Sequence, residues 1–206
     1  MKSLLLAVTT IILAHVDGGI AASAHPTPRA SSSPLALYQA LVRTSFGARE
    51  LPPGFTARAT PSATRGGPRQ AIGEVGFRID GPAHGSTPTI DVIVYGVLPT
   101  DGDAAAVFAA GPQTVLNPRD HRITGTRTMR LLGLPARIVT VQVTNIDGSG
   151  GKGIVGYSYC SVRVGGVVVT AGSGIMGDRT TGDTPTAIVL ARTAMAHLSS
   201  VRDARR

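Results

Sequence analysis

Two runs of β-favouring residues, separated by a pair of glycines, constrain the fold of this chain more than any other feature. The sequence YSYCSVRV is followed by Gly165-Gly166 and then by VVVTAG. A two-glycine turn between such runs is typical of a tight β-hairpin, and the turn sets the register of the two strands. It predicts three cross-strand pairs, which are Val164 with Val167, Val162 with Val169 and Cys160 with Ala171.

The only cysteine of the chain, Cys160, falls on the valine-rich face of this hairpin. A free cysteine in such a place behaves as a small hydrophobic residue, and burial raises its pKa and blunts its reactivity. The alternatives are a catalytic thiol or an intermolecular disulfide. A nucleophile needs a neighbouring base and exposure, and the sequence indicates neither. We therefore predict that Cys160 fills the core.

The opposite face of the hairpin carries the candidate binding residues Tyr157, Tyr159 and Arg163, together with Ser161. Tyrosine and arginine are enriched at the energetic centres of binding surfaces. One hypothesis is therefore that this face is the floor of a cleft or an interaction patch. The alternative is that a helix covers this face too and that both tyrosines belong to the core, since a central strand can be buried on both sides.

The remaining elements indicate an α+β fold. SPLALYQALVRTSFG and DTPTAIVLARTAMAHLSSVRDARR begin with capping residues and proline and predict an N-terminal and a C-terminal helix. The apolar face of the first is predicted to carry Leu35, Tyr38, Leu41, Val42 and Phe46. PTDGDAAAVFAAG predicts a short crossover helix. EVGFRID, TIDVIVYGVL, HRITGTRTMRLLG and ARIVTVQVTN predict strands, and TIDVIVYGVL is apolar on both faces, as a central strand covered on both sides would be. Residues 56–71 are expected to be an irregular loop. These elements predict a single, mainly antiparallel sheet packed by the three helices.

The first residues predict export. Lys2 precedes a short apolar run that cannot span a bilayer, and an A-x-A site ends at Ala24. Residues 1–24 are therefore expected to be a signal peptide, 25–34 a flexible spacer and 35–206 a single α+β domain. No later segment is expected to cross a membrane.

The formal charge of +8 is almost entirely arginine. Within RDHRITGTRTMR, the equal parity of Arg122 and Arg130 predicts that they share a strand face, where their guanidinium groups suit a carboxylate or phosphate, while Arg127 points elsewhere. The alternative is a solvated basic strand. One interpretation of the charge is attraction to an anionic envelope component, and the other, which we favour, is that compositional bias toward arginine produces it. Another secreted protein is the alternative partner. The export signal and the absence of a binding motif argue against nucleic acid.

No motif supports catalysis, a metal or a cofactor. GYSYC imitates the G-x-S-x-G nucleophile elbow, but it ends in cysteine and its serine lies within a strand. GSGGKG lacks the serine or threonine of a phosphate loop. The histidines do not have metal-ligand spacing. We therefore predict that the protein is not an enzyme.

The order of elements resembles that of small secreted actinobacterial domains. A signal peptide, a helix followed by LPPGF, the unit IDVIVYGVLPTDGDAAAVFAAG, the strand CSVRVGGVVV and a last helix are similar in order to mycobacterial LpqN-type lipoproteins with a PsbP-like fold and to extracellular sensor domains of receptor kinases. A single cysteine cannot form the disulfides of those sensor domains, and no lipid-attachment cysteine follows the signal peptide. The resemblance implies a non-catalytic binding or accessory role and transfers no residues.

Three functions are consistent with these observations. The first is a secreted, non-catalytic ligand-binding or protein-interaction domain of the cell envelope or extracellular space. The second is a structural or adhesive protein held to the envelope by its cationic surface. The third is a secreted enzyme whose site is assembled from residues far apart in the sequence.

The A-x-A site predicts cleavage after Ala24, so the exported protein should begin at His25. N-terminal sequencing of the protein recovered from culture filtrate measures this directly. Recovery of mature protein that still carries Met1 would contradict the export argument.

Overall fold

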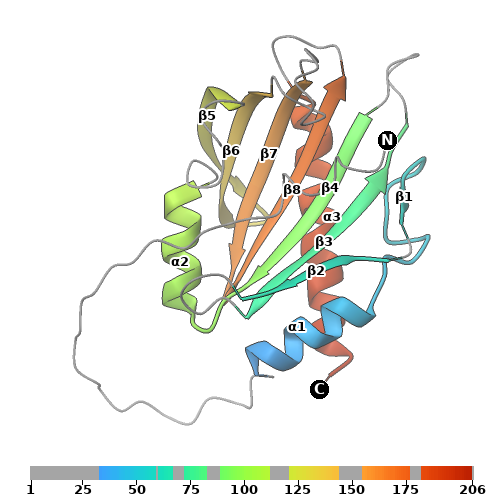
Figure 1. The fold of residues 1–206 in the computed structure, drawn as a ribbon, viewed down its shortest axis with the longest axis vertical. Coiled ribbons are helices and arrows are strands. Elements are labelled where there is room, and N and C mark those ends of the chain that lie inside the picture. The colour runs from blue at the N-terminus through green and yellow to red at the C-terminus, as the bar shows by residue number, and fades with distance from the viewer. Residues whose placement is uncertain are drawn as a thin grey trace.

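The computed structural model describes residues 33–58, 60–66, 72–82, 89–111, 121–143, 155–176 and 182–205. The predicted signal peptide, and all but the last two residues of the predicted spacer, lie outside these ranges. Within them the chain has three helices and a mainly antiparallel sheet, which confirms the α+β prediction (Figure 1).

Eight strands form one sheet. They are β1 (Thr56–Ala57), β2 (Ser62–Arg65), β3 (Gly73–Asp80), β4 (Thr89–Val97), β5 (His121–Leu131), β6 (Leu134–Val143), β7 (Val155–Val164) and β8 (Val167–Met176). Their order across the sheet is β1-β3-β4-β8-β7-β6-β5, and β2 also pairs with β3. Strands β1 and β2 fall where the sequence predicts a loop, because both are short and polar and their pairing with β3 is not a local property of the sequence.

The hairpin of β7 and β8 has the predicted register. Val164 pairs with Val167 and Cys160 with Ala171. Gly165 has a φ of 58°, a left-handed conformation that glycine adopts without a steric penalty. Cys160 is 0% exposed, as predicted, and burial raises the pKa of its thiol from 9.0 to about 11 although two arginines oppose the shift.

Helix α3 (Thr184–Asp203) crosses the face of the sheet that we call the back face, and α1 (Pro34–Arg43) packs beside it (Figure 1). Both helices begin as predicted: Ser33 caps α1, and Asp183 caps α3. Leu35 is exposed, contrary to expectation, because α1 buries the neighbouring stripe formed by Leu37, Tyr38 and Leu41. The back face and these helices form the main core, to which the sheet contributes Val75, Phe77, Ile79, Ile93, Tyr95, Cys160, Val162, Val169 and Ala171.

Helix α2 (Asp101–Ala110) lies on the opposite, front face of the sheet, where it packs on β7 and β8. Thr100 caps it by accepting a hydrogen bond from the Asp103 N–H at 3.1 Å. Its contact is a small cluster of Leu98, Ala104 and Val168. None of the described helices is both long and apolar enough to cross a membrane.

Strand β4 is central, as predicted, but its two faces are not equally covered. On the back face Ile93 and Tyr95 are fully buried, whereas on the front face Ile90, Val92 and Val94 are only half-buried. The front of β4 is therefore only partly covered.

Candidate functional site

The front face can be followed along rows of residues that pair across the strands from β7 to β3. Three rows, named by their β7 residue, are the Tyr159 row (Tyr159, Gly172, Val92, Arg78), the Ser161 row (Ser161, Thr170, Val94, Gly76) and the Arg163 row (Arg163, Val168, Gly96, Glu74). The predicted residues Tyr157, Tyr159 and Arg163 therefore do share one face of the hairpin, opposite Cys160.

The two tyrosines of this face form a stacked pair over glycine. The rings of Tyr157 and Tyr159 are 4.9 Å apart between centroids, with an interplanar angle of 23°. A Cβ built on Gly172 would lie 2.9 Å from the first ring and 3.0 Å from the second, and Gly174 is still closer to Tyr157. The Tyr157 hydroxyl donates to the carbonyl oxygen of Ile90 at 2.7 Å. The rings thus lean across β8 toward β4 and fill the space that the two glycines leave.

Burial supports the core alternative for these tyrosines. Tyr157 is 5% exposed and Tyr159 is 7% exposed, and both belong to a cluster with Val139, Val141 and Val155. Burial also raises the pKa of both phenols well above its ordinary value. The hydroxyl of Tyr157 is committed to Ile90, so the pair stabilises the sheet instead of presenting an open patch.

Arg163 contacts the neighbouring helix. Its Nη1 donates to the carbonyl oxygen of Asp101, at the start of α2, at 3.4 Å. Arg202, in the last turn of α3, contacts the same hairpin, since its Nη2 donates to the carbonyl oxygen of Val164 at 3.1 Å. Arg163 and Arg202 therefore connect the β7–β8 hairpin to α2 and α3.

The predicted convergence of Arg122 and Arg130 is corrected by the structure. The register of β5 against β6 shifts between Ile123 and Gly125, as in a β-bulge. The extra residue reverses the alternation, so Arg122 lies on the back face with Arg127, and Arg130 lies on the front face. All three arginines are exposed, and no shared site for Arg122 and Arg130 remains.

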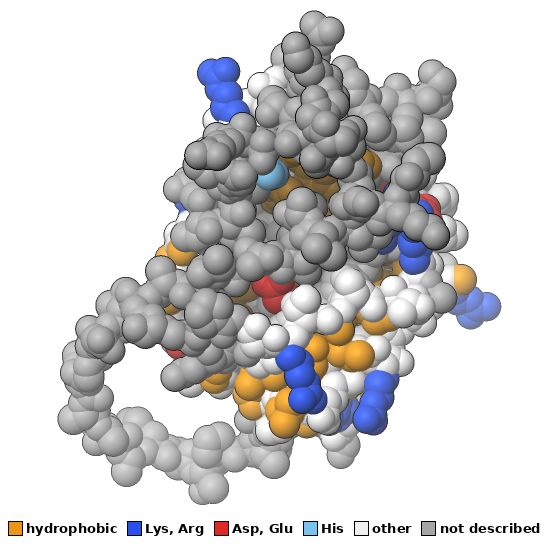
Figure 2. Space-filling view, in the orientation of Figure 1, with side chains coloured by type: hydrophobic (Ala, Val, Ile, Leu, Met, Phe, Trp, Pro, Cys, Tyr) orange, Lys and Arg blue, Asp and Glu red, His pale blue; other side chains and the backbone are white. Residues whose placement is uncertain are grey.

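The partly exposed stretch of the front face runs along β4, next to the tyrosine pair, while Glu74 and Gly76 of β3 beside it are buried. There Val92 and Val94 are half-buried, and Gly76 and Gly96 contribute no side chains. Figure 2 shows this side of the molecule, on which hydrophobic side chains of the described residues are visible between polar ones, with basic side chains beside them and at the rim. This surface, which we call the β3–β4 shelf, comprises Gly76, Val92, Val94, Gly96 and Glu74.

Glu74 is the unusual member of the shelf. It is only 9% exposed, and its Oε2 atom is buried without a hydrogen-bond partner among the described residues. Burial alone raises the pKa of its carboxyl group from 4.5 to about 7. A carboxyl group in this state can exchange a proton near neutral pH or receive a hydrogen-bond donor.

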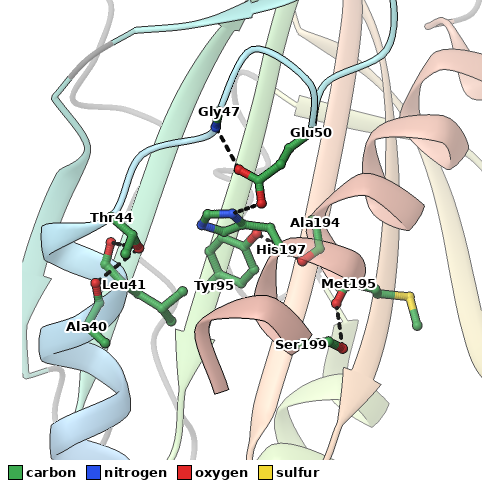
Figure 3. Close-up of polar contacts among 10 residues, drawn as sticks. All are labelled: Ala40, Leu41, Thr44, Gly47, Glu50, Tyr95, Ala194, Met195, His197 and Ser199. Carbon is green, nitrogen blue, oxygen red and sulfur yellow. Dashed lines mark hydrogen bonds and ion pairs between the residues drawn. The ribbon is translucent and has the colours of Figure 1, made fainter. Parts of the chain in front are cut away.

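A contact between an exposed carboxylate and a buried histidine joins the loop after α1 to α3 (Figure 3). Oε1 of Glu50 lies 3.1 Å from Nδ1 of His197, and its Oε2 accepts from the Gly47 N–H at 2.6 Å. Burial raises the pKa of Glu50, but the hydrogen bonds from Gly47 and His197 and the charge of His197 lower it to a net value below the ordinary one. Phe46 stacks on the imidazole at 4.2 Å.

The surroundings of this pair are unsuitable for catalysis. His197 is 3% exposed, and its Nε2 atom has no hydrogen-bond partner among the described residues. The rings of Phe77 and Tyr95 both lie 6.2 Å from the imidazole, and the Tyr95 hydroxyl already donates to the carbonyl oxygen of Ala194. A general base must reach a substrate, so we interpret the pair as an anchor for the loop.

Metal chemistry has no obvious location in the described part of the chain. No group of three or more histidine, cysteine, aspartate or glutamate residues is placed there to hold a metal ion. No protein-family model matches the sequence, and no curated protein matches it significantly. The function must therefore be argued from the geometry of the front face.

Sequence reasoning missed Glu74, Glu50 and His197. The alternation of EVGFRID places Glu74 opposite the apolar residues, which ordinarily indicates a solvated side chain. The one available signal was Gly76, two residues along the same face of the strand, because a glycine has no side chain and so changes the surroundings of its neighbour Glu74. The pairing of Glu50 with His197 joins residues far apart in the sequence, and no local pattern indicates it.

The glycines under the tyrosines predict a position-specific cost. Gly174→Ala should destabilise the protein by about 1–3 kcal/mol, because the new methyl group would collide with the Tyr157 ring. The matched control is Gly96→Ala, whose Cβ would have no neighbour closer than 3.7 Å and should change stability little. Urea denaturation measures both, and equal effects at the two positions would contradict the proposed packing.

The buried carboxyl group predicts a pH-dependent stability. The native state holds the Glu74 proton up to about pH 7 and the unfolded chain loses it near 4.5, so stability falls as pH rises through this window. Glu74→Gln should therefore stabilise the protein by up to about 3 kcal/mol at pH 8 and leave it nearly unchanged at pH 5. Urea denaturation at both values tests this, with Asp80→Asn at the exposed end of β3 as control. The same change at both pH values would contradict it.

Proposed function

We propose that this protein is a non-catalytic binding domain that acts after export, in the cell envelope or the extracellular space, and that it binds its ligand on the β3–β4 shelf. The observation that carries this proposal is the uneven covering of the sheet. Helices α3 and α1 pack with the back face, and α2 packs on β7 and β8, whereas no described helix packs on the front of β3 and β4.

The composition of the shelf supports binding. Val92 and Val94 offer apolar area, and Gly96 lets a ligand approach the backbone of β4, whereas the Ser62 side chain lies against Gly76. Binding sites are commonly apolar surfaces with a small number of placed polar groups, and Glu74 is such a group. The rigid tyrosine pair borders this surface, so its shape is fixed before a ligand arrives.

Export and the absence of catalysis are parts of the same proposal. The signal peptide predicted at 1–24 supports a site of action outside the cytoplasm. The burial of the His197 imidazole and of the Cys160 thiol supports a function without nucleophilic chemistry. The resemblance in element order to secreted binding domains points the same way.

The shelf can be tested with Nile red, a neutral dye that fluoresces on apolar surfaces. Val94→Arg should reduce dye binding to the purified protein at least several-fold, because it places a charge in the middle of the shelf. The matched control is Val189→Arg, on the exposed side of α3, which should bind dye as the wild type does. Val94→Thr, which keeps the side-chain shape, should give an intermediate loss in a folded protein.

Equal dye binding by Val94→Arg and Val189→Arg would contradict the assignment of the shelf. Circular dichroism melting of each variant establishes that it is folded. The cationic alternative makes a different prediction, since high salt would release an envelope protein held by its net charge of +8 but would not affect dye binding.

A further inference from the structure

The carboxyl group of Glu74 lacks the partner that a buried acid normally has. Its Oε2 atom is buried, and no described residue gives it a hydrogen bond. The ion pairs among the described residues join Arg58 and Arg78 to Asp80 and His197 to Glu50, and none includes Glu74. Buried carboxylates are ordinarily paired with a cation or receive hydrogen bonds, so this one is suited to an external donor.

The space beside Glu74 could admit such a donor. Glu74 pairs with Gly96 on one side and with Thr64 of β2 on the other. A Cβ built on Gly96 would have as its nearest neighbours the carbonyl oxygen of Val168 at 3.7 Å and Cδ2 of Leu98 at 3.9 Å. These are ordinary contacts, so an added carbon atom over Gly96, the residue paired with Glu74, meets no steric obstacle among the described residues.

The charged residues around the site are occupied elsewhere. Arg78, on the same face of β3 as Glu74, forms an ion pair with Asp80 at the end of that strand. Arg163, in the same row as Glu74, donates to the carbonyl oxygen of Asp101. Asp101 and Asp103 lie at the start of α2, which packs on β7 and β8. Both are acidic, so neither supplies a cation that could pair with Glu74. Burial is the single cause of the raised pKa of Glu74.

We propose that Glu74 binds the cationic nitrogen of a small amine or guanidine ligand whose apolar part rests on Val92 and Val94. The N–H groups of an ammonium or guanidinium ion would give the buried carboxylate its missing hydrogen bonds. The valines would contact the hydrocarbon portion of the same ligand. This inference rests on the proposed function, since it names the class of ligand for the shelf.

Binding of a cation should be linked to loss of the Glu74 proton. The ligand binds the carboxylate, and the proton of the neutral acid passes to the solvent. With a pKa of about 7, the ionised fraction at pH 8 exceeds that at pH 5.5 by about 30-fold, and the affinity should rise by a similar factor. A neutral analogue of the same shape should show no such dependence.

The probes are n-butylammonium and n-butylguanidinium, with n-butanol as the neutral control. Each is titrated into the purified protein and followed by two-dimensional NMR at pH 5.5 and pH 8. At least one cationic probe should bind about 30-fold more tightly at pH 8 and shift the amide signals of β3 and β4. Glu74→Gln should weaken this binding at pH 8 at least tenfold, and the charge-matched control Asp80→Asn should leave it unchanged.

A second variant tests the site without removing the acid. Thr64 is exposed and lies directly opposite Glu74, so Thr64→Lys places an ammonium group within the same chain next to the carboxylate. This variant should weaken probe binding at least tenfold. Unchanged affinity in Thr64→Lys, equal affinity in Glu74→Gln, or no binding of either cation at pH 8 would overturn the inference. If Nile red binding still depended on Val94 in that case, the proposal that the shelf binds a ligand would stand, and only the class of ligand would be wrong.

Discussion

The register of the β7–β8 hairpin is the constraint on which the rest of the structure depends. Side chains alternate strictly along a strand, so a shift of one residue would move every side chain of β7 to the other face. In the observed register Cys160 and Val162 enter the core under α3, and the two tyrosines lie on the front. Because β6 pairs with β7 and β4 pairs with β8, the hairpin also sets which residues of those strands face each side.

The two faces of the sheet are covered in different ways. The back face is covered by α3 and α1 and holds aliphatic and aromatic side chains in one large core. Among the described helices only α2 packs on the front face, and the tyrosine rings of the sheet itself fill the space over Gly172 and Gly174. This arrangement leaves the neighbouring β3–β4 shelf half-covered, with Glu74 at its end.

Local sequence patterns predicted the elements well and the site poorly, for a physical reason. Capping residues, prolines and the paired glycines act within a few residues, so the helices and the hairpin register could be derived before the structure was known. The environment of Glu74 depends instead on which strand lies beside it, and that is decided by contacts distant in sequence. The β-bulge near Gly125 is an intermediate case, since glycine within a strand signals it but does not determine its position.

That same bulge lies on an edge strand, where pairing with another molecule can begin. Strand β5 is the last strand of the described sheet on its side, and it is eleven residues long, so its unpaired backbone could template the addition of a strand from another molecule. The bulge moves Arg122 to the back face beside Arg127, and Arg130 lies on the front face, so both faces of this edge carry arginine. A second copy approaching the edge would meet like charge from either side. The arginines of β5 thus act as a barrier to edge-to-edge aggregation.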